Sequence, residues 1–247
     1  MTSATTTLLR SETRLAAREP ASVFWIMIFP TALLLILGAV PSFREPGAEL
    51  GGQRPVDVYV SVAVTLSIIM AAIFAMPSVV TTYRERGILR RLRTTPVHPG
   101  SLILAQVVVH GAAVLVSAIL VVTVGRVALD VPLPQSVPWY LLVSLLTATA
   151  TFAMGAAITA VSPTTRIAQA LSMVVAFPAM FTAGLWLPVQ AMQGWLHTIV
   201  VATPLGAGSE ALNDALLGRA PELVDIAVML GWTAVLALLA VRTFRWE

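Results

Sequence analysis

The chain contains no lysine and no cysteine, and only 11% of its 247 residues are charged. Without lysine it cannot form a P-loop of the Gly-x-x-x-x-Gly-Lys-Ser/Thr type, so we expect that it is not itself an ATPase of that class. Without cysteine it has no disulfide, thiolate zinc site or cysteine nucleophile. Its three histidines lie far apart in the sequence, and neither His-Glu-x-x-His nor Gly-x-Ser-x-Gly occurs. We therefore expect no catalytic residue and no metal site.

The scarcity of charge accompanies a high share of hydrophobic residues. These make up 57% of the chain, and the mean hydropathy is +0.88, whereas a soluble domain carries about 25% charged residues. A helix that spans a bilayer needs about 20 mostly apolar residues. The long uncharged runs therefore predict one all-α membrane domain over residues 1–247, with six spans at about 22–40, 58–80, 101–125, 139–161, 167–187 and 224–243.

Six spans would place both termini on one side of the membrane. On that side the two tails and the loops 81–99 and 162–166 hold eleven arginines and four acidic residues, while the other three loops hold four arginines and eight acidic residues. Because basic residues gather in cytoplasmic loops, we expect both termini and the 81–99 loop to face the cytoplasm. The expected location is the plasma membrane of a bacterium, and the exclusive use of arginine beside many alanines and valines suggests a GC-rich genome.

Two segments outside the spans have a helical pattern. In residues 6–20, three arginines at spacings of four residues form a stripe beside a leucine-rich sector, which predicts a helix on the membrane surface. Residues 188–222 contain two apolar pieces that are each too short to span, so we expect two short re-entrant helices in the outer leaflet. The alternative is a seventh span near 186–203, which would move the C-terminal arginines to the outside.

The densest charge lies between the second and third expected spans. Six of the ten residues from Arg84 to Arg93 are charged, and each charge at the bilayer centre costs about 2.5–3.5 kcal/mol, so the stretch must lie in water or at the headgroups. Glu85 to Arg93 can form about two helical turns with an apolar face that suits docking into a groove on another protein. The alternatives are a loop without a partner, or packing on the chain's own helix ends. The face comprises Ile88, Leu89 and Leu92.

Polar, sulfur-containing and aromatic residues inside the spans are candidates for a transport path. Gln106 and His110 lie one turn apart in the third span, where they either take part in transport or bond neighbouring helices. Methionine and aromatic side chains of the second and fifth spans either form an adaptable apolar path or serve as packing and lipid contacts. These side chains belong to Met70, Phe74, Met173, Phe177, Met180 and Phe181.

The charged stretch also carries a motif. It reads Glu85-Arg86-Gly87-x-Leu89-x-x-Leu92-Arg93-x-Thr95-Pro96, and it resembles the E-R-G-x-L-x-x-L-x-x-[ST]-P segment of ABC-2-type permeases, the membrane subunits of ABC exporters. Three later segments resemble that family's fifth span and external re-entrant region, namely Phe181–Val189, Gly194–Leu196 and Pro204–Gly218. The likeness covers nearly the whole chain in the right order and is nearest to the daunorubicin-resistance type of drug-export permease.

The resemblance implies a division of labour between subunits in the type V exporter fold. A separate ATPase subunit would hold ATP and Mg²⁺, so this chain would need no cofactor of its own. Two permease subunits, identical or related, would pair, with their second and fifth spans along the path of an exported hydrophobic or amphipathic compound. No nucleic acid partner is implied. The ATPase would contact a coupling helix in the 81–99 loop, with candidate residues Arg84, Glu85, Arg86, Gly87, Ile88, Leu89, Leu92, Arg93 and Pro96.

A second hypothesis remains open beside export. A membrane scaffold or assembly factor could use the same permease fold, bind a partner and transport nothing. Drug-stimulated ATP hydrolysis in liposomes distinguishes the two, because only a transporter couples a transported compound to the ATPase.

Overall fold

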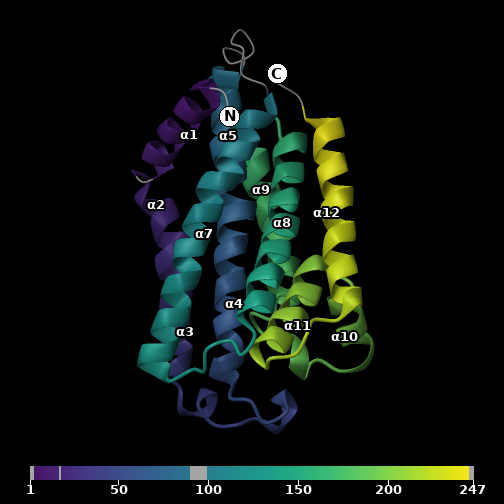
Figure 1. Cartoon of the computed structure of the whole chain (residues 1–247). Helices are drawn as coiled ribbons and strands as arrows, with labels where there is room; N and C mark the ends of the chain where they lie inside the picture. Colours follow the sequence, from purple (N-terminus) through teal and green to yellow (C-terminus); the bar gives the residue numbers. More distant parts are fainter. Residues whose placement is uncertain (1–2, 17, 90–98, 245–247) are drawn as a thin grey trace.

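The computed structural model describes residues 3–16, 18–89 and 99–244, and all regular structure in these ranges is helical. Long helices stand side by side in one bundle, and shorter helices lie toward its two ends (Figure 1). This architecture agrees with the expected all-α membrane protein.

Five helices in the described residues are long and apolar enough to cross a membrane. The one in the middle, which we call the central helix, is the most enclosed, since 89% of its most apolar stretch is buried by the others. The first helix comprises α2 (Pro20–Val23), η1 (Phe24–Ile28) and α3 (Phe29–Gly38). The central helix comprises α4 (Pro55–Ile69), η4 (Met70–Ala75) and α5 (Met76–Glu85), and the remaining three are α7 (Pro99–Leu129), α8 (Val137–Val161) and α12 (Leu223–Thr243).

The predicted fifth span, at 167–187, corresponds to α9 (Thr165–Thr182), which is not among these five helices. α9 has only 18 residues, and Arg166 and Gln169 near its start lower its hydropathy. It ends before Gly184, whose φ of +86° lies in the left-handed region that glycine favours. The described residues therefore support five candidate spans, and the six-span topology is not confirmed.

The segment 188–222, for which we expect two short helices, contains the single turn η5 (Val189–Ala191), α10 (Gly194–Val201) and α11 (Pro204–Leu216). α10 has eight residues and is too short to cross a bilayer, which argues against a seventh span near 186–203. α11 is buried against its neighbours, because Gly206 lets it approach the backbone of α10 and Gly208 lets it approach α8. The loop after the first helix holds two single turns, η2 (Pro41–Phe43) and η3 (Ala48–Leu50).

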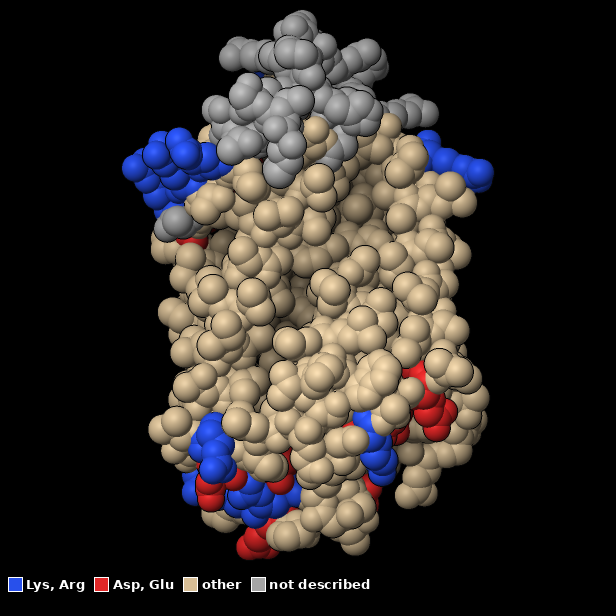
Figure 2. Space-filling model, in the orientation of Figure 1, with Lys and Arg blue, Asp and Glu red and all other residues tan. Residues whose placement is uncertain are grey.

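Both described ends of the chain lie at the same end of the bundle, near the connection between α5 and α7, whereas α10 and α11 lie at the opposite end (Figure 1). α1 (Ser3–Ala16) slants along the outside toward the first end. That end carries seven arginines and three glutamates among the described residues, and the opposite end carries four arginines and eight acidic residues. We call the first the arginine end. Figure 2 shows that the middle of this face has no charged side chain.

Pro77 frees a backbone carbonyl in the central helix, and a serine of α9 bonds to it. A proline lacks the N–H that would bond the carbonyl four residues earlier, here that of Ile73, and the helix widens into the π-helical turn η4 just before it. Ser172 Oγ of α9 donates to Ile73 O over 2.6 Å. Since no water reaches the hydrocarbon region, this bond satisfies a group that would otherwise cost several kcal/mol.

The same arrangement recurs in the first helix. Pro30 leaves the carbonyl of Ile26 without its helical partner, next to the π-helical turn η1. Ser117 Oγ of α7 donates to Ile26 O over 2.7 Å and lies 2.7 Å from Ser67 Oγ of the central helix. Both proline sites are therefore also hydrogen-bonded junctions between helices, which connect the first helix to α7 and α9 to the central helix.

Replacing Ser172 by alanine should destabilise the bundle by about 1–3 kcal/mol, because it leaves the buried carbonyl of Ile73 unbonded. Thermal unfolding of the purified protein in detergent measures this as a lower midpoint. Thr149→Val is the matched control, since the hydroxyl of Thr149 bonds the carbonyl of Leu145 within its own helix, and it should change the midpoint much less.

A double-mutant cycle isolates the cause. Pro77→Ala restores an N–H that can reach Ile73 O, so Ser172→Ala should cost less in that background than in the wild type. An equal cost in both backgrounds would show that the serine does not act through the carbonyl freed by Pro77.

Candidate functional site

Arg84, the penultimate residue of the central helix, binds the end of α8. Its Nη1 donates to Thr159 O over 3.1 Å and to Ser162 O at shorter range. These carbonyls lie at the C-terminus of α8, where the last carbonyls lack helical partners and the helix dipole favours a cation. The guanidinium carbon lies 5.3 Å from the centroid of the Phe244 ring just past α12, in the range of a cation–π contact. Arg84 thus connects the central helix with the ends of α8 and α12.

Glu85, the next residue, binds the beginning of α9. Its Oε1 accepts from the backbone N–H of Thr165 over 2.9 Å, and its Oε2 accepts from Thr165 Oγ1 over 3.0 Å. Thr165 opens α9, where N–H groups lack helical partners and the dipole favours an anion. Two adjacent residues of opposite charge therefore engage two helix ends of opposite polarity, one on each side of the short link between α8 and α9. We call this arrangement the Arg84–Glu85 joint.

The helix that carries the joint ends directly after it. Gly87 has a φ of +68°, and its N–H bonds the carbonyl of Arg84, as is usual where a helix ends in glycine. A Cβ at this position would meet no atom within 4 Å, so the left-handed backbone alone favours glycine here. The central helix therefore ends at Glu85, with Arg86 as its C-cap. The helical segment expected from Glu85 to Arg93 is interrupted at Gly87 and is helical again at Ile88 and Leu89, and its remaining residues lie outside the described part of the chain.

The apolar residues of the expected docking face differ in how far they are buried. Leu89 is only 1% exposed, so it packs inside the chain, which is the alternative named for this face. Ile88 is half-buried, and Arg86 is exposed. Leu92, Arg93 and Pro96 lie outside the described residues. Arg84 and Glu85 thus anchor the described part of the segment to the bundle.

A second polar cluster fastens α1 to the bundle close to the joint. Glu12 of α1 is 6% exposed, and its Oε2 accepts from Tyr83 Oη over 2.9 Å and from Gln106 Nε2 over 2.6 Å. His110 is buried, and its Nδ1 lies 2.9 Å from the carbonyl of Gln106 one turn earlier. Gln106 therefore bonds neighbouring helices, and His110 bonds its own. Glu12 was not predicted from the sequence. The only sequence feature that sets it apart is that it lies outside the stripe formed by the three arginines in residues 6–20.

The six residues of the expected transport path do not converge within one chain. Met70 is buried, and Phe74 and Met180 pack around the same core, so they join the central helix to α9. Met173 and Phe177 are 67% and 69% exposed and face outward from α9. The Phe177 ring lies 4.9 Å from that of Trp186, and Phe181 lies near the same ring. Part of the set is thus internal packing, and part is an exposed aromatic surface.

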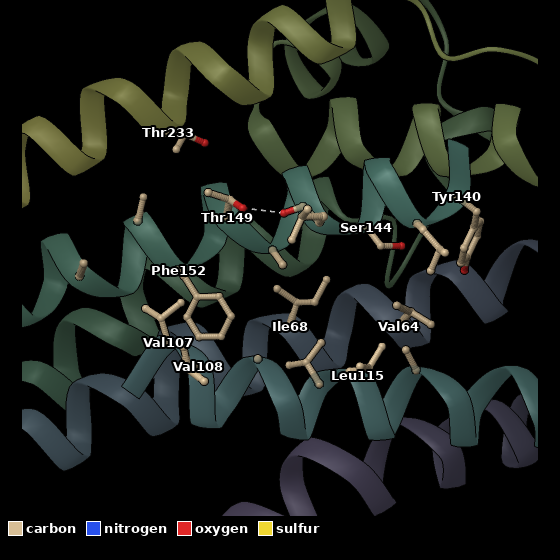
Figure 3. A pocket seen from close by; sticks show the side chains of 18 of the residues that line it. Val64, Ile68, Val107, Val108, Leu115, Tyr140, Ser144, Thr149, Phe152 and Thr233 are labelled. Carbon is tan, nitrogen blue, oxygen red and sulfur yellow. Dashed lines mark hydrogen bonds between the residues drawn. The ribbon is translucent and has the colours of Figure 1, made fainter. Parts of the chain in front are cut away.

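An apolar hollow lies elsewhere in the bundle. A groove with a volume of about 1230 Å³ runs between α7 and α8, with α4 as its floor and α12 along one side (Figure 3). Ile68 rises from the floor between Leu115 of α7 and Phe152 of α8, and the few polar side chains include Ser144 and Thr233. The groove was not predicted from the sequence, because apolar residues are spread around most of α7 and their pattern does not indicate which face meets α8.

Comparison with known proteins assigns the chain to a family. Residues 3–217 match the ABC-2 type transporter family, which is most of the chain, and the protein belongs to that family. It is a membrane permease of an ABC transporter. No curated protein matches the chain.

Glu12→Ala should release α1 from the bundle, because it leaves the amide of the buried Gln106 and the hydroxyl of Tyr83 without their acceptor. The expected loss is about 1–3 kcal/mol, seen as faster hydrogen exchange of the α1 amides. Glu12→Gln keeps an acceptor oxygen and should exchange more slowly than Glu12→Ala. Equal protection of α1 in the wild type and in Glu12→Ala would contradict this account of the cluster.

Proposed function

We propose that the chain is the permease subunit of an exporter that moves a hydrophobic or amphipathic compound out of the cytoplasm. A separate ATPase subunit that holds ATP and Mg²⁺ supplies the energy, and a second copy or a related permease completes the membrane part. Membership of the ABC-2 family and the absence of a lysine for a P-loop both support this division. The motif resemblance favours the daunorubicin-resistance type of drug exporter.

The arginine end faces the cytoplasm in this proposal. Its surplus of arginines over glutamates, and the reverse balance at the opposite end, follow the positive-inside rule. Both termini and the segment after Glu85 then lie in the cytoplasm, where an ATPase can reach them. The expected setting is the plasma membrane of a bacterium.

The observation that carries the proposal is the Arg84–Glu85 joint. It lies where the central helix emerges from the bundle, and it bonds the facing ends of α8 and α9. An ATPase that displaces the segment after Glu85 therefore moves three helices together instead of bending one. Such a rigid-body shift is a known way to convert a local movement into a change across a membrane domain.

The outward aromatic surface of α9 is the proposed contact with the second permease subunit. Met173, Phe177 and Trp186 are large and exposed there, whereas Met70 and Phe74 lie behind them on the central helix. A transport path between two such subunits would run beside α9, with these side chains adapting to different compounds.

Breaking the joint should uncouple transport from ATP hydrolysis while leaving the ATPase bound. In the double variant Arg84→Gln and Glu85→Gln, export of fluorescent amphipathic compounds from vesicles should fall about tenfold or more, equivalent to about 1.4 kcal/mol or more. Co-purification of the ATPase should persist, because Arg86 and the segment beyond it are unchanged. The measurements are vesicle export and pull-down with the tagged permease.

Arg14→Gln is the control, because it removes an exposed arginine at the same end without touching the joint, and it should export normally. Full export by the double variant would contradict the role of the joint. A wild-type permease that binds no ATPase, or that binds one and exports nothing, would favour the scaffold hypothesis.

A further inference from the structure

The groove between α7 and α8 extends over the whole depth of the bundle. At the arginine end it is lined by Ile103 and Phe244, and at the opposite end by Leu133 and Tyr140. Its walls include large exposed apolar side chains, such as Leu104, Ile119 and Leu145. α7 and α8 touch each other at very few places along this length. The groove is therefore an apolar channel that faces the bilayer from one side to the other.

Such a channel does not stay empty or fill with water in a membrane. Its walls offer few polar partners, whereas a stably bound water needs two to four. In a bilayer, lipid chains already lie beside the exposed walls. A chain that enters the groove makes van der Waals contacts with its walls, and an empty groove would lack these contacts. The occupant is therefore hydrocarbon.

The groove has room for the hydrocarbon of one lipid. Taking a methylene group as about the size of a water, roughly 30 Å³, a volume of about 1230 Å³ admits roughly 40 of them, which is enough for the two acyl chains of one phospholipid. A helix of a second copy is the competing occupant, and the labelling experiment below distinguishes the two.

Charge indicates where the headgroup lies. Phe244 closes the groove at the arginine end, and the guanidinium of Arg84 lies over its ring. Val241 lines the groove, and the next residue in the sequence, Arg242, is exposed. The opposite mouth lies at the end where acidic residues outnumber arginines. Basic surroundings between membrane helices attract anionic headgroups.

We propose that this groove is a binding site for one anionic phospholipid, with its acyl chains between α7 and α8 and its phosphate at the arginine end. The lipid fills the gap between two helices that otherwise scarcely meet, and so supports α8, which Arg84 connects to the central helix. The site does not depend on the proposed export function, because it needs only the groove and its surrounding charges.

Gly111 provides the test of the groove. It lines the groove, and a Cβ there would meet no atom within 4 Å, so Gly111→Phe inserts a ring into the space of the acyl chains without a clash at its base. Native mass spectrometry of the purified full-length protein should find a retained phospholipid in the wild type and at least a fivefold lower occupancy in Gly111→Phe. Gly231→Phe is the matched control, because Gly231 is also unobstructed but lies outside the groove lining.

Titration of lipid-stripped protein tests the headgroup. Phosphatidylglycerol should bind at least fivefold more tightly than phosphatidylcholine, and Arg242→Gln should reduce this preference. Arg126→Gln, which removes an arginine at the opposite end, should not reduce it. If both lipids bind equally to the wild type, the assignment of an anionic headgroup is overturned.

A photoactivatable phosphatidylglycerol with its label in the acyl chain provides a readout that needs no variant to fold. It should label α7 and α8 in wild-type protein in bilayers. Labelling confined to other helices would overturn the proposal, and so would equal lipid occupancy in Gly111→Phe and the wild type. Purification of a wild-type protein that carries a hydrophobic non-lipid compound in this groove would overturn it as well.

Discussion

The structure depends on one constraint, which is that every backbone N–H and carbonyl group inside a membrane needs a partner from the protein. Pro30 and Pro77 break the internal bonding of two spanning helices, and serines from neighbouring helices replace the lost bonds. The ends of α8 and α9 raise the same problem at the arginine end. Arg84 and Glu85 solve it there with charged groups. The proline sites and the helix ends thereby become the places where helices are joined.

These joints give the central helix its role. It is enclosed by the other helices along most of its length, it receives the hydroxyl of Ser172 from α9 midway, and it holds α8 and α9 through the Arg84–Glu85 joint at its end. α1 is bonded to it close by, through Glu12 and Tyr83. A force on the segment after Glu85 therefore reaches α1, α8 and α9 through direct bonds, as the proposed coupling to another subunit requires.

The sequence predicted the features that follow from hydrophobicity alone. Long apolar runs indicated the helices that became the first helix, the central helix, α7, α8 and α12, and short runs indicated α10 and α11. α9 was the exception, because Arg166 and Gln169 leave it marginal as a span. The family resemblance drew attention to Glu85 and its neighbours, and the match over residues 3–217 supports that resemblance.

The hydrogen-bond partners of individual side chains could not be predicted from the hydrophobicity of the sequence. The bond of Glu85 goes to Thr165, 80 positions away, and no local pattern encodes that pairing. Glu12 was not predicted because burial of a carboxylate depends on donors from distant helices. The break at Gly87 was missed because the apolar spacing of Ile88, Leu89 and Leu92 favoured a continuous helix. The groove was missed because an apolar helix does not reveal which of its faces meets another helix and which meets lipid.

The central claim is that the end of the central helix and the beginning of α9 move as one body when the ATPase works. The chain has no cysteine, so spin labels on Arg86→Cys and Arg166→Cys, both at exposed positions, report the distance between these two elements by pulsed electron resonance. In the complex with its ATPase, the distance distribution should be the same in the nucleotide-free and ATP-bound states. A shift of the distribution upon ATP binding would show that the two helices separate, which would contradict the account.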